Sequence, residues 1–433
     1  MIGWEYPPHI TGGLAVASRG LAQALGALGH TVHFVVPRVT GDEPKDTNVT
    51  ITGVNSKSIP LSAEELQQYL IKTIHLTQNS PYNSLDYLPT ESSQSTIAQQ
   101  TLIRQIESGL SMHSLAELQG GYGNRLYSEI QAFAEFVARI AQHLDIDIIH
   151  AHDWMTYPAG LYAAHVLKKP LIAHVHATEF DRSGDNPNQY VFDLEHHTYS
   201  NCDGIITVSN YTRSVLTSRY NIDSNKIFPV YNAAEFDIQL QNNIRKPVKE
   251  KIVLFLGRIT FQKGPDYFVR AAKRVIEEYQ NVRFVMVGAG DMYHRMIEMA
   301  ADLGIGKHFH YTGFLNRDDI NRIFRMSSLY VLPSVSEPFG ISVLEAMVAG
   351  VPVIVSKQSG VSEVIENCIK VNFWDIDEIA DQILTLLQDD KLHHQLSQEG
   401  QNEVRHLSWS ESAKKISNIY QTVATIRQTK PST

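Results

Sequence analysis

The sequence has few cysteines, no long apolar run and no strong excess of charge of either sign. Its 433 residues include only Cys202 and Cys368, too few for a disulfide framework or a cysteine-rich metal site. No apolar stretch approaches the ~18 residues of a membrane-spanning helix, so we predict no integral membrane segment. The first ten residues, MIGWEYPPHI, lack the basic start and apolar stretch of a signal peptide, and we therefore expect a cytoplasmic protein.

The charge balance is moderately acidic, with 46 Asp and Glu against 37 Lys and Arg and a net charge of −9. This balance argues against broad non-specific binding of nucleic acid, although it allows a local basic pocket. Hydrophobic residues make up 43% and charged residues 19% of the chain, which is typical of a globular protein. At about 150 residues per domain, the length indicates two or three domains.

Strand-like and helix-like segments alternate through most of the chain. Gly12-Gly13 precedes an apolar stripe at helical spacing, and Val32–Val36 follows as a strand. The strand before Gly12 is short, and we expect it to begin upstream of Met1. Further apolar, β-rich runs fall into two series, at 146–151, 171–175, 204–208 and 227–231, and at 252–256, 284–287, 309–312, 329–332 and 351–355. Two such series predict an α/β protein with two doubly wound parallel sheets.

Polar segments indicate where the domains end. Residues 237–250 are polar and contain Pro247, which predicts a break between an N-terminal domain, 1–240, and a second domain, 241–407. Residues 42–123 are rich in Ser, Thr, Gln and Asn, and we expect them to form an insertion with one helix and long loops. A final helix at about 408–428, with Ser408 as its N-cap, has no following strand and must pack on a domain already formed.

Ligands of open parallel sheets bind beyond the carboxyl ends of the strands, so residues that directly follow strands are candidates for the site. Arg258 and Lys263 follow the first strand of the second series in the segment GRITFQKG. Two cations at this position suit a phosphate or diphosphate. The alternative is a pair of solvated surface cations.

The segment EPFGISVLE places Glu337 before a predicted helix at 341–349 and Glu345 within it. The free N–H groups at the start of this helix, from Gly340 to Ser342, form a potential anion site. Eight residues of helix rise about 12 Å, so the two glutamates are too far apart for the ~5–5.5 Å pair of a retaining hydrolase. We expect them to contact different parts of one extended ligand, although a glutamate in a first helical turn also stabilises the helix dipole.

Two further patterns are ambiguous. The segment VGAGDMY begins like a dinucleotide-binding loop, but Tyr293 occupies the third glycine position, so we interpret it as a turn lining the cleft. His150 and His152 share one face of a strand, as do His174 and His176. Buried structural histidines and a metal site are both possible, and we predict no metal because no cysteine or acidic ligand has a suitable spacing. His152 and His176 end their strands, where a functional role is expected.

Together these motifs resemble retaining glycosyltransferases of the GT-B type, families 4 and 5, which include glycogen and starch synthases. The resemblance rests on GGLA near the start, HAHDW, GRxxxxKG and EPFGxxxLE, and covers nearly the whole chain. It implies two Rossmann-like domains facing across a cleft, with the last helix crossing back onto the N-terminal domain. It also implies a nucleoside diphosphate sugar as donor, UDP- or ADP-glucose, and a carbohydrate acceptor.

The resemblance further implies a role for each motif residue. Arg258 and Lys263 would hold the donor diphosphate, Glu337 would lie beside the donor sugar, and Glu345 would accept from the ribose hydroxyls. His176 would meet the sugar near the reacting carbon, and Asp153 would lie on the acceptor side. The remaining donor-binding residues would be Gly12, Gly13, Phe339, Gly340, Ile341 and Ser342, with Phe314 and Leu315 placed to line the base pocket.

The expected activity is retaining transfer of glucose to an α-glucan, with no cofactor and no obligatory metal. One departure favours an alternative: family 5 enzymes commonly carry Lys-Thr-Gly-Gly-Leu, and here the lysine is replaced by Ile10. A family 4 enzyme acting on a small-molecule or polysaccharide acceptor is therefore the second interpretation. The third is a sugar-nucleotide-binding protein without turnover, and the presence of Arg258, Lys263, Glu337 and Glu345 argues against it.

Overall fold

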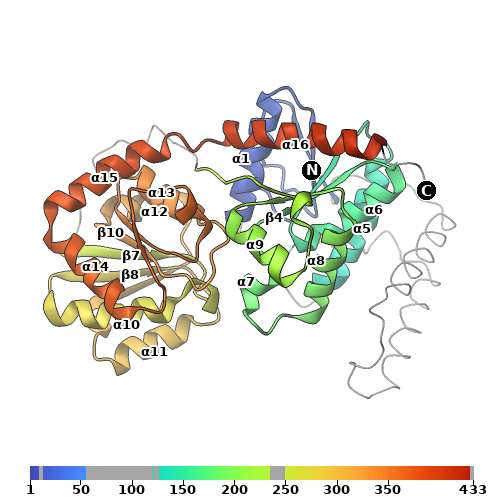
Figure 1. Cartoon of the computed structure of the whole chain (residues 1–433). Helices are drawn as coiled ribbons and strands as arrows, with labels where there is room; N and C mark the ends of the chain where they lie inside the picture. The colour runs from blue at the N-terminus through green and yellow to red at the C-terminus, as the bar shows by residue number, and fades with distance from the viewer. Residues whose placement is uncertain (9–12, 55–119, 121–125, 235–248, 430–433) are drawn as a thin grey trace, which may run out of the picture.

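The protein consists of two parallel α/β domains joined by a long C-terminal helix (Figure 1). The computed structural model describes residues 1–8, 13–54, 120, 126–234 and 249–429. Every strand pairing in both sheets is parallel. The predicted α/β class with two Rossmann-like domains is thereby confirmed.

The N-terminal sheet is built around residues 1–3. Ile2 bridges both Val35 and Ala151, so it joins the pair β1–β2 to the series β3–β4–β5–β6. The strands are β1 (Val32–Val36), β2 (Val49–Gly53), β3 (Ile149–His152), β4 (Leu171–Val175), β5 (Gly204–Thr207) and β6 (Ile227–Pro229). The helices are α1 (Gly13–Ala27), α5 (Leu126–Ala141), α6 (Tyr157–Leu167), α7 (Glu179–Ser183), α8 (Gln189–Asn201) and α9 (Asn210–Arg219), with short 3-10 helices η3 (Trp154–Thr156) and η4 (Ser224–Lys226).

The C-terminal sheet has the order β12–β11–β10–β7–β8–β9. Its strands are β7 (Lys251–Leu256), β8 (Val282–Val287), β9 (Phe309–Gly313), β10 (Leu329–Leu332), β11 (Val353–Ser356) and β12 (Ile369–Val371). The surrounding helices are α10 (Pro265–Glu278), α11 (Tyr293–Asp302), α12 (Arg317–Met326), α13 (Ile341–Val348), α14 (Ile376–Gln388) and α15 (Asp390–Val404), with η6 (Phe261–Lys263), η7 (Gly306–His308) and η8 (Gly360–Glu363). The central strands β10 and β11 are buried on both faces, as their nearly continuous apolar sequence predicts.

Two strands differ from the expectation. Val49–Gly53 falls inside the expected insertion, yet it forms β2 and pairs with β1 residue by residue. An edge strand needs few buried side chains, so it can contain polar residues such as Thr50. For this reason the sequence of β2 shows no continuous apolar run. The short β12 was not predicted either. The remainder of the expected insertion, with its helix at 63–74, lies outside the described residues.

The last helix, α16 (Trp409–Thr429), leaves the C-terminal domain and lies against α1 of the N-terminal domain (Figure 1). The indole of Trp409 occupies the space next to Gly20 of α1. A Cβ on Gly20 would lie only 2.5 Å from Trp409 Nε1, so this contact requires glycine. Further along, Tyr420 donates to or accepts from His150 Nδ1 at 2.6 Å. The final helix thus closes the apolar face of the N-terminal sheet.

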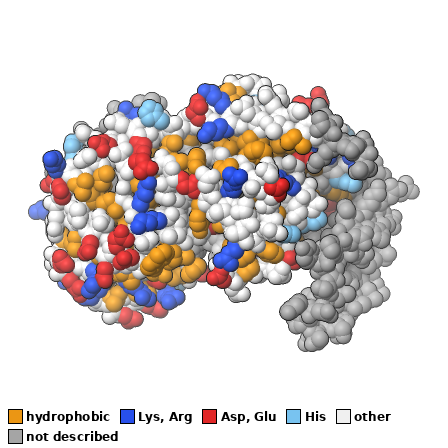
Figure 2. All heavy atoms as spheres, in the orientation of Figure 1, with side chains coloured by type: hydrophobic (Ala, Val, Ile, Leu, Met, Phe, Trp, Pro, Cys, Tyr) orange, Lys and Arg blue, Asp and Glu red, His pale blue; other side chains and the backbone are white. Residues whose placement is uncertain are grey.

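The surface in Figure 2 carries acidic and basic side chains interspersed over both domains, and neither sign forms a broad patch on that face. Among the described helices, none combines the length and the apolar character needed to cross a membrane.

Candidate active site

The strongest feature of the C-terminal domain is an ion pair at the carboxyl edge of its sheet. Lys263 Nζ lies 2.5 Å from Glu337 Oε2, and both side chains are largely buried. Ser334 donates to the same oxygen at 3.3 Å. The sequence predicted these two residues from separate motifs, and the structure brings them together. The pair sets an amine and a carboxyl group side by side at the edge of the sheet, where an anion and a developing cation can be bound.

Gln262 connects the loop after β7, which carries Arg258 and Lys263, to the loop after β10, which carries Glu337. Its backbone oxygen accepts from the N–H of Val335 at 3.0 Å, and its side-chain oxygen accepts from Arg258 Nη2 at 3.1 Å. The guanidinium of Arg258 is therefore held beside η6, on the same edge of the sheet as Lys263. The GAG turn packs on this loop, since a Cβ at Gly288 would lie 1.9 Å from the oxygen of Gly257. The turn thus needs glycine for close loop packing.

The segment after Glu337 turns sharply into α13. Gly340 precedes the helix at φ 108°, a conformation that favours glycine. Phe339 is buried beneath it. Ser342, in the first turn, exchanges a hydrogen bond with Tyr330 at 2.8 Å. Helix α13 therefore begins at Ile341, beside Glu337, where the sequence predicts an anion site.

The outer part of the site carries the residues predicted to hold the nucleoside. The carboxylate of Glu345 forms an ion pair with Arg317 of α12. Phe314 is 66% exposed, whereas Leu315 packs against the core of the domain. Of these, Phe314 is the side chain most exposed to a ligand at this end, whereas Glu345 is held by its ion pair.

In the other domain, α1 begins opposite the start of α13. A Cβ on Gly13, the first residue of α1, would lie 4.0 Å from Ile341 Cδ1. The predicted glycine of the N-terminal domain therefore faces the predicted anion site of the other domain. Gly12 lies outside the described residues.

Asp153 and His176 lie together at the carboxyl edge of the N-terminal sheet. Asp153 has φ 61°, and its Oδ1 accepts from the N–H groups of His176 at 2.7 Å and Ala177 at 3.3 Å. Burial raises the pKa of Asp153 to about 6, while nearby Arg182 opposes the rise. Asp153 therefore positions the His176 loop, a function that its motif alone did not indicate.

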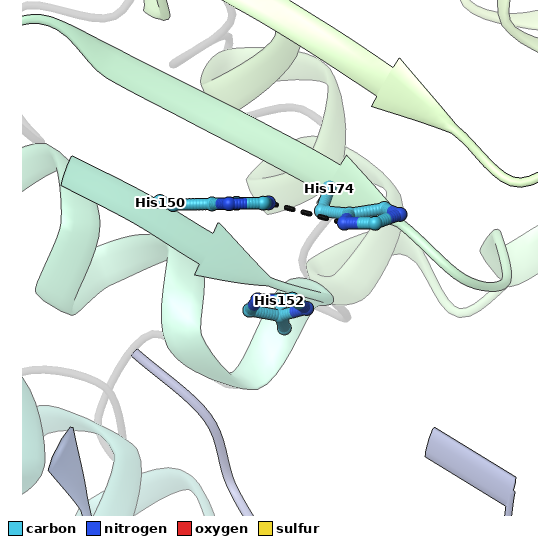
Figure 3. Close-up of side chains that lie close together, drawn as sticks. All are labelled: His150, His152 and His174. Atoms are coloured by element: carbon cyan, nitrogen blue, oxygen red, sulfur yellow. Dashed lines mark hydrogen bonds between the residues drawn. The ribbon is translucent and has the colours of Figure 1, made fainter. Parts of the chain in front are cut away.

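His150 and His152 of β3, His174 of β4 and His176 just after β4 form two stacked layers. Figure 3 shows the first three of these rings. His150 Nε2 and His174 Nδ1 are 3.0 Å apart in one layer, and His152 Nδ1 and His176 Nε2 are 2.9 Å apart in the other. Burial lowers the pKa of all four, that of His176 to about 3. His176 is consequently a neutral imidazole whose orientation is fixed by His152.

The histidine cluster is also the candidate metal centre among the described residues. One nitrogen from each of His150, His152 and His174 lies within 4.8 Å of the others. However, the rings of His150 and His152 stack at 4.4 Å with planes 18° apart, and those of His150 and His174 are 15° apart. Lone pairs lie in the ring planes, so the stacked rings of His150 and His152 do not direct theirs at one ion. This stacking argues against a shared ion, and we propose that the cluster is a hydrogen-bonded packing unit.

Hydrogen bonds join the two domains, and sequence analysis missed most of them. Ser336 donates to Asp181 of α7 at 2.5 Å, and Ser209 donates to the oxygen of Pro338 at 2.6 Å. Glu363 of η8 accepts from the N–H groups of Asn210 and Tyr211, at 2.9 and 2.6 Å, at the start of α9. Ser209 and Ser336 each follow a strand, which was their only signal in the sequence. For Glu363 there was none.

Comparison with known proteins identifies the family. Residues 115–237 match the family model described as Glycosyltransferase Family 4, and residues 237–403 match that described as Glycosyl transferases group 1. An uncharacterised glycosyltransferase of Methanocaldococcus jannaschii is 30% identical and covers 97% of both chains. The chain belongs to this group of GT-B glycosyltransferases, of the family 4 and family 5 type, as the sequence motifs predicted.

More distant relatives differ in their named acceptors. A D-inositol 3-phosphate glycosyltransferase of Corynebacterium efficiens is 23% identical over 69% of this chain and 77% of its own. A glycogen synthase of Mycobacterium tuberculosis is 23% identical over 85% of this chain and 80% of its own.

Solved structures share the fold over nearly the whole chain. Sucrose-phosphate synthase of Thermosynechococcus elongatus superposes with a TM-score of 0.68 at 19% identity, covering 96% of this chain and 94% of its own. Anabaena HepE, in complex with UDP and glucose, superposes with a TM-score of 0.65 at 16% identity, covering 97% and 98%. The GT-B fold is thereby confirmed.

Proposed function

We propose that the protein is a retaining glycosyltransferase that moves glucose from UDP- or ADP-glucose to an α-glucan. The observation that carries the proposal is the buried Lys263–Glu337 pair, adjoining Arg258 and the start of α13. Support comes from the glycogen synthase among the relatives and from HepE, whose structure contains UDP and glucose.

On the donor side, the cations act on the leaving group. Arg258, Lys263 and the first N–H groups of α13 would bind the diphosphate and stabilise the negative charge that grows as its bond to the sugar breaks. These groups are held in place before reaction by Gln262, Glu337 and Tyr330. Such prior alignment is what makes electrostatic stabilisation effective.

On the sugar side, the bond between the anomeric carbon and the phosphate oxygen breaks as the acceptor oxygen bonds to the same face of that carbon. The acceptor proton passes to the leaving diphosphate, and the configuration is retained. Glu337 would lie beside the positive charge that develops on the sugar ring. His176, neutral because burial lowers its pKa to about 3, would offer a hydrogen bond without adding charge.

We also propose that catalysis needs no obligatory metal. The two motif carboxylates are already paired, Glu337 with Lys263 and Glu345 with Arg317. Lysine and arginine thus supply the positive charge that a divalent ion supplies in other transferases. We expect full activity in EDTA, and restoration of lost activity by Mn²⁺ or Mg²⁺ would contradict this.

A family 4 enzyme with a small-molecule or polysaccharide acceptor is the second candidate. It is favoured by Ile10, which replaces the lysine common in family 5 enzymes, and by the relative named for D-inositol 3-phosphate.

The test is the release of nucleoside diphosphate from UDP-, ADP- and GDP-sugars, each with and without glycogen or maltooligosaccharides. Glucan-dependent release from UDP- or ADP-glucose is the expected result. Release of nucleoside diphosphate that glucan does not stimulate would favour the second candidate, a family 4 enzyme with another acceptor. Tight nucleotide binding with no release from any donor, across glucan, inositol phosphate and cyclitol acceptors, would contradict the proposed activity.

A further inference from the structure

Two half-exposed tyrosines contact each other beside the candidate active site. Tyr127 is 44% exposed and Tyr190 is 47% exposed. Their rings meet edge to face with centroids 4.8 Å apart, and Tyr127 also contacts Trp154 at 6.2 Å. Each tyrosine is the second residue of its helix, α5 or α8. Exposed aromatic rings are costly to hydrate, so a paired set of them indicates a surface that is covered when in use.

The topology of the sheet places this aromatic cluster at the ligand-binding edge. Helices α5 and α8 each run toward the amino edge, because they feed β3 and β5. Their first residues therefore lie at the carboxyl edge, and both helices contact η3, which follows β3. Trp154 is the first residue of η3 and comes directly after Asp153. The cluster thus continues the site on the side of the N-terminal domain, away from the diphosphate-binding groups.

Neighbouring polar groups indicate the chemistry of the ligand. The exposed Gln189 donates to the exposed Asp193 at 2.7 Å, one turn apart on α8. Amide and carboxylate groups beside aromatic rings suit hydroxyl groups attached to an apolar ring face. The carboxylate of Asp193 would repel a phosphate, so a neutral ligand is favoured over a phosphorylated one.

We propose that Tyr127 and Tyr190, backed by Trp154, bind a pyranose ring of a neutral oligosaccharide acceptor, beyond the ring that reacts. The inference rests on the proposed function in naming this ligand the acceptor. It deepens that function by selecting an oligosaccharide over a single small polyol, because a second binding position is useful only to a chain of sugars.

The test is electrophoresis of the full-length protein in native gels that contain glycogen or dextran. The wild type should be retarded in at least one gel. Tyr190→Ala and Tyr127→Ala should lower the affinity by roughly tenfold, the order expected for losing one aromatic contact, whereas Tyr190→Trp should retain it. Trp374→Ala removes another exposed aromatic, 55% exposed on the C-terminal domain, and should behave as wild type. Circular dichroism of each variant checks its fold.

Two outcomes would overturn the inference: no retardation of the wild type in either gel, or equal retardation of Tyr190→Ala. UDP affinity, measured by calorimetry, should be the same in Tyr190→Ala and wild type. If the aromatic variants lose retardation but no donor releases its nucleotide, the sugar-binding surface stands and the proposed transferase activity fails. The two proposals are therefore separable.

Discussion

At the scale of single residues, Lys263 has both an electrostatic and a structural role. Replacing it by alanine should lower kcat by about 10²–10³, in line with losing one preorganised charge donor at a transition state. Glu337, 5% exposed, would be left without its cation, so the melting temperature should also fall. Steady-state kinetics with the donor found for the wild type measures the first effect. Lys273→Ala, which breaks only an exposed pair with Glu277 on α10, is the control, and a wild-type kcat in Lys263→Ala would contradict the assignment.

The buried carboxyl group of Asp153 should make the free energy of unfolding depend on pH. Its pKa is raised from 3.8 to about 6 by burial, so between these values the native chain binds more protons than the unfolded one. Stability contributed by this group therefore falls as pH rises through that window. Asp153→Asn keeps the Oδ1 acceptor for the His176 N–H but has no charge to bury. The free energy of unfolding of this variant, relative to wild type, should rise by about 1 kcal/mol from pH 5 to pH 8.

Denaturant titrations at the two pH values measure this difference. The exposed Asp147 provides the matched control, since Asp147→Asn removes a charge that lies outside the core. A difference for Asp153→Asn that is constant with pH, or that shrinks toward pH 8, would show that the carboxylate is not destabilised by burial.

At the scale of elements, the packing of α16 on α1 depends on a missing side chain. Gly20→Ala would place a Cβ 2.5 Å from Trp409 Nε1. Alanine improves helix propensity by about 1 kcal/mol, but overpacking a close helix contact costs about 1–3 kcal/mol. We expect a net loss of stability of up to about 2 kcal/mol, measured by chemical denaturation. Gly306→Ala, where the added Cβ meets no atom within 4 Å, should change stability little. Stabilisation by Gly20→Ala would mean that α16 can move away at no cost.

Some strands could be predicted from the sequence and others could not, depending on where they lie in the sheet. Central strands such as β7 and β10 were predictable because burial on both faces makes them continuously apolar, and the residues after them, including Arg258 and Glu337, followed from the geometry of parallel sheets. Strands β2 and β12 lie at sheet edges and lack that signal. Pairings such as Lys263 with Glu337, 74 residues apart, depend on how the loops meet. Only resemblance to a family indicated that they share one site.

At the scale of the whole molecule, polar contacts join the two domains where α9 meets η8. Glu363 of η8 accepts from two backbone N–H groups at the start of α9 and from the hydroxyl of Tyr231 at 3.0 Å. A carboxylate from one domain thus caps a helix of the other, where the helix dipole favours negative charge. These polar contacts adjoin an apolar one, because Val208 and Tyr231 pack against the core of the C-terminal domain near Phe339. We expect the polar contacts to break and re-form as the domains open around α16.

Removal of this cap should therefore shift the molecule toward an open form. Glu363 is exposed, so each of its hydrogen bonds to α9 contributes roughly 1 kcal/mol, and Glu363→Ala should reduce the ratio of closed to open molecules by about tenfold or more. Small-angle X-ray scattering should show a larger radius of gyration for this variant. Glu366→Ala, which breaks only a surface pair with Lys370, should scatter as wild type. If Glu363→Ala keeps the compact scattering profile, the domains are held together by Ser336, Ser209 and the packing of α16 rather than by the cap on α9.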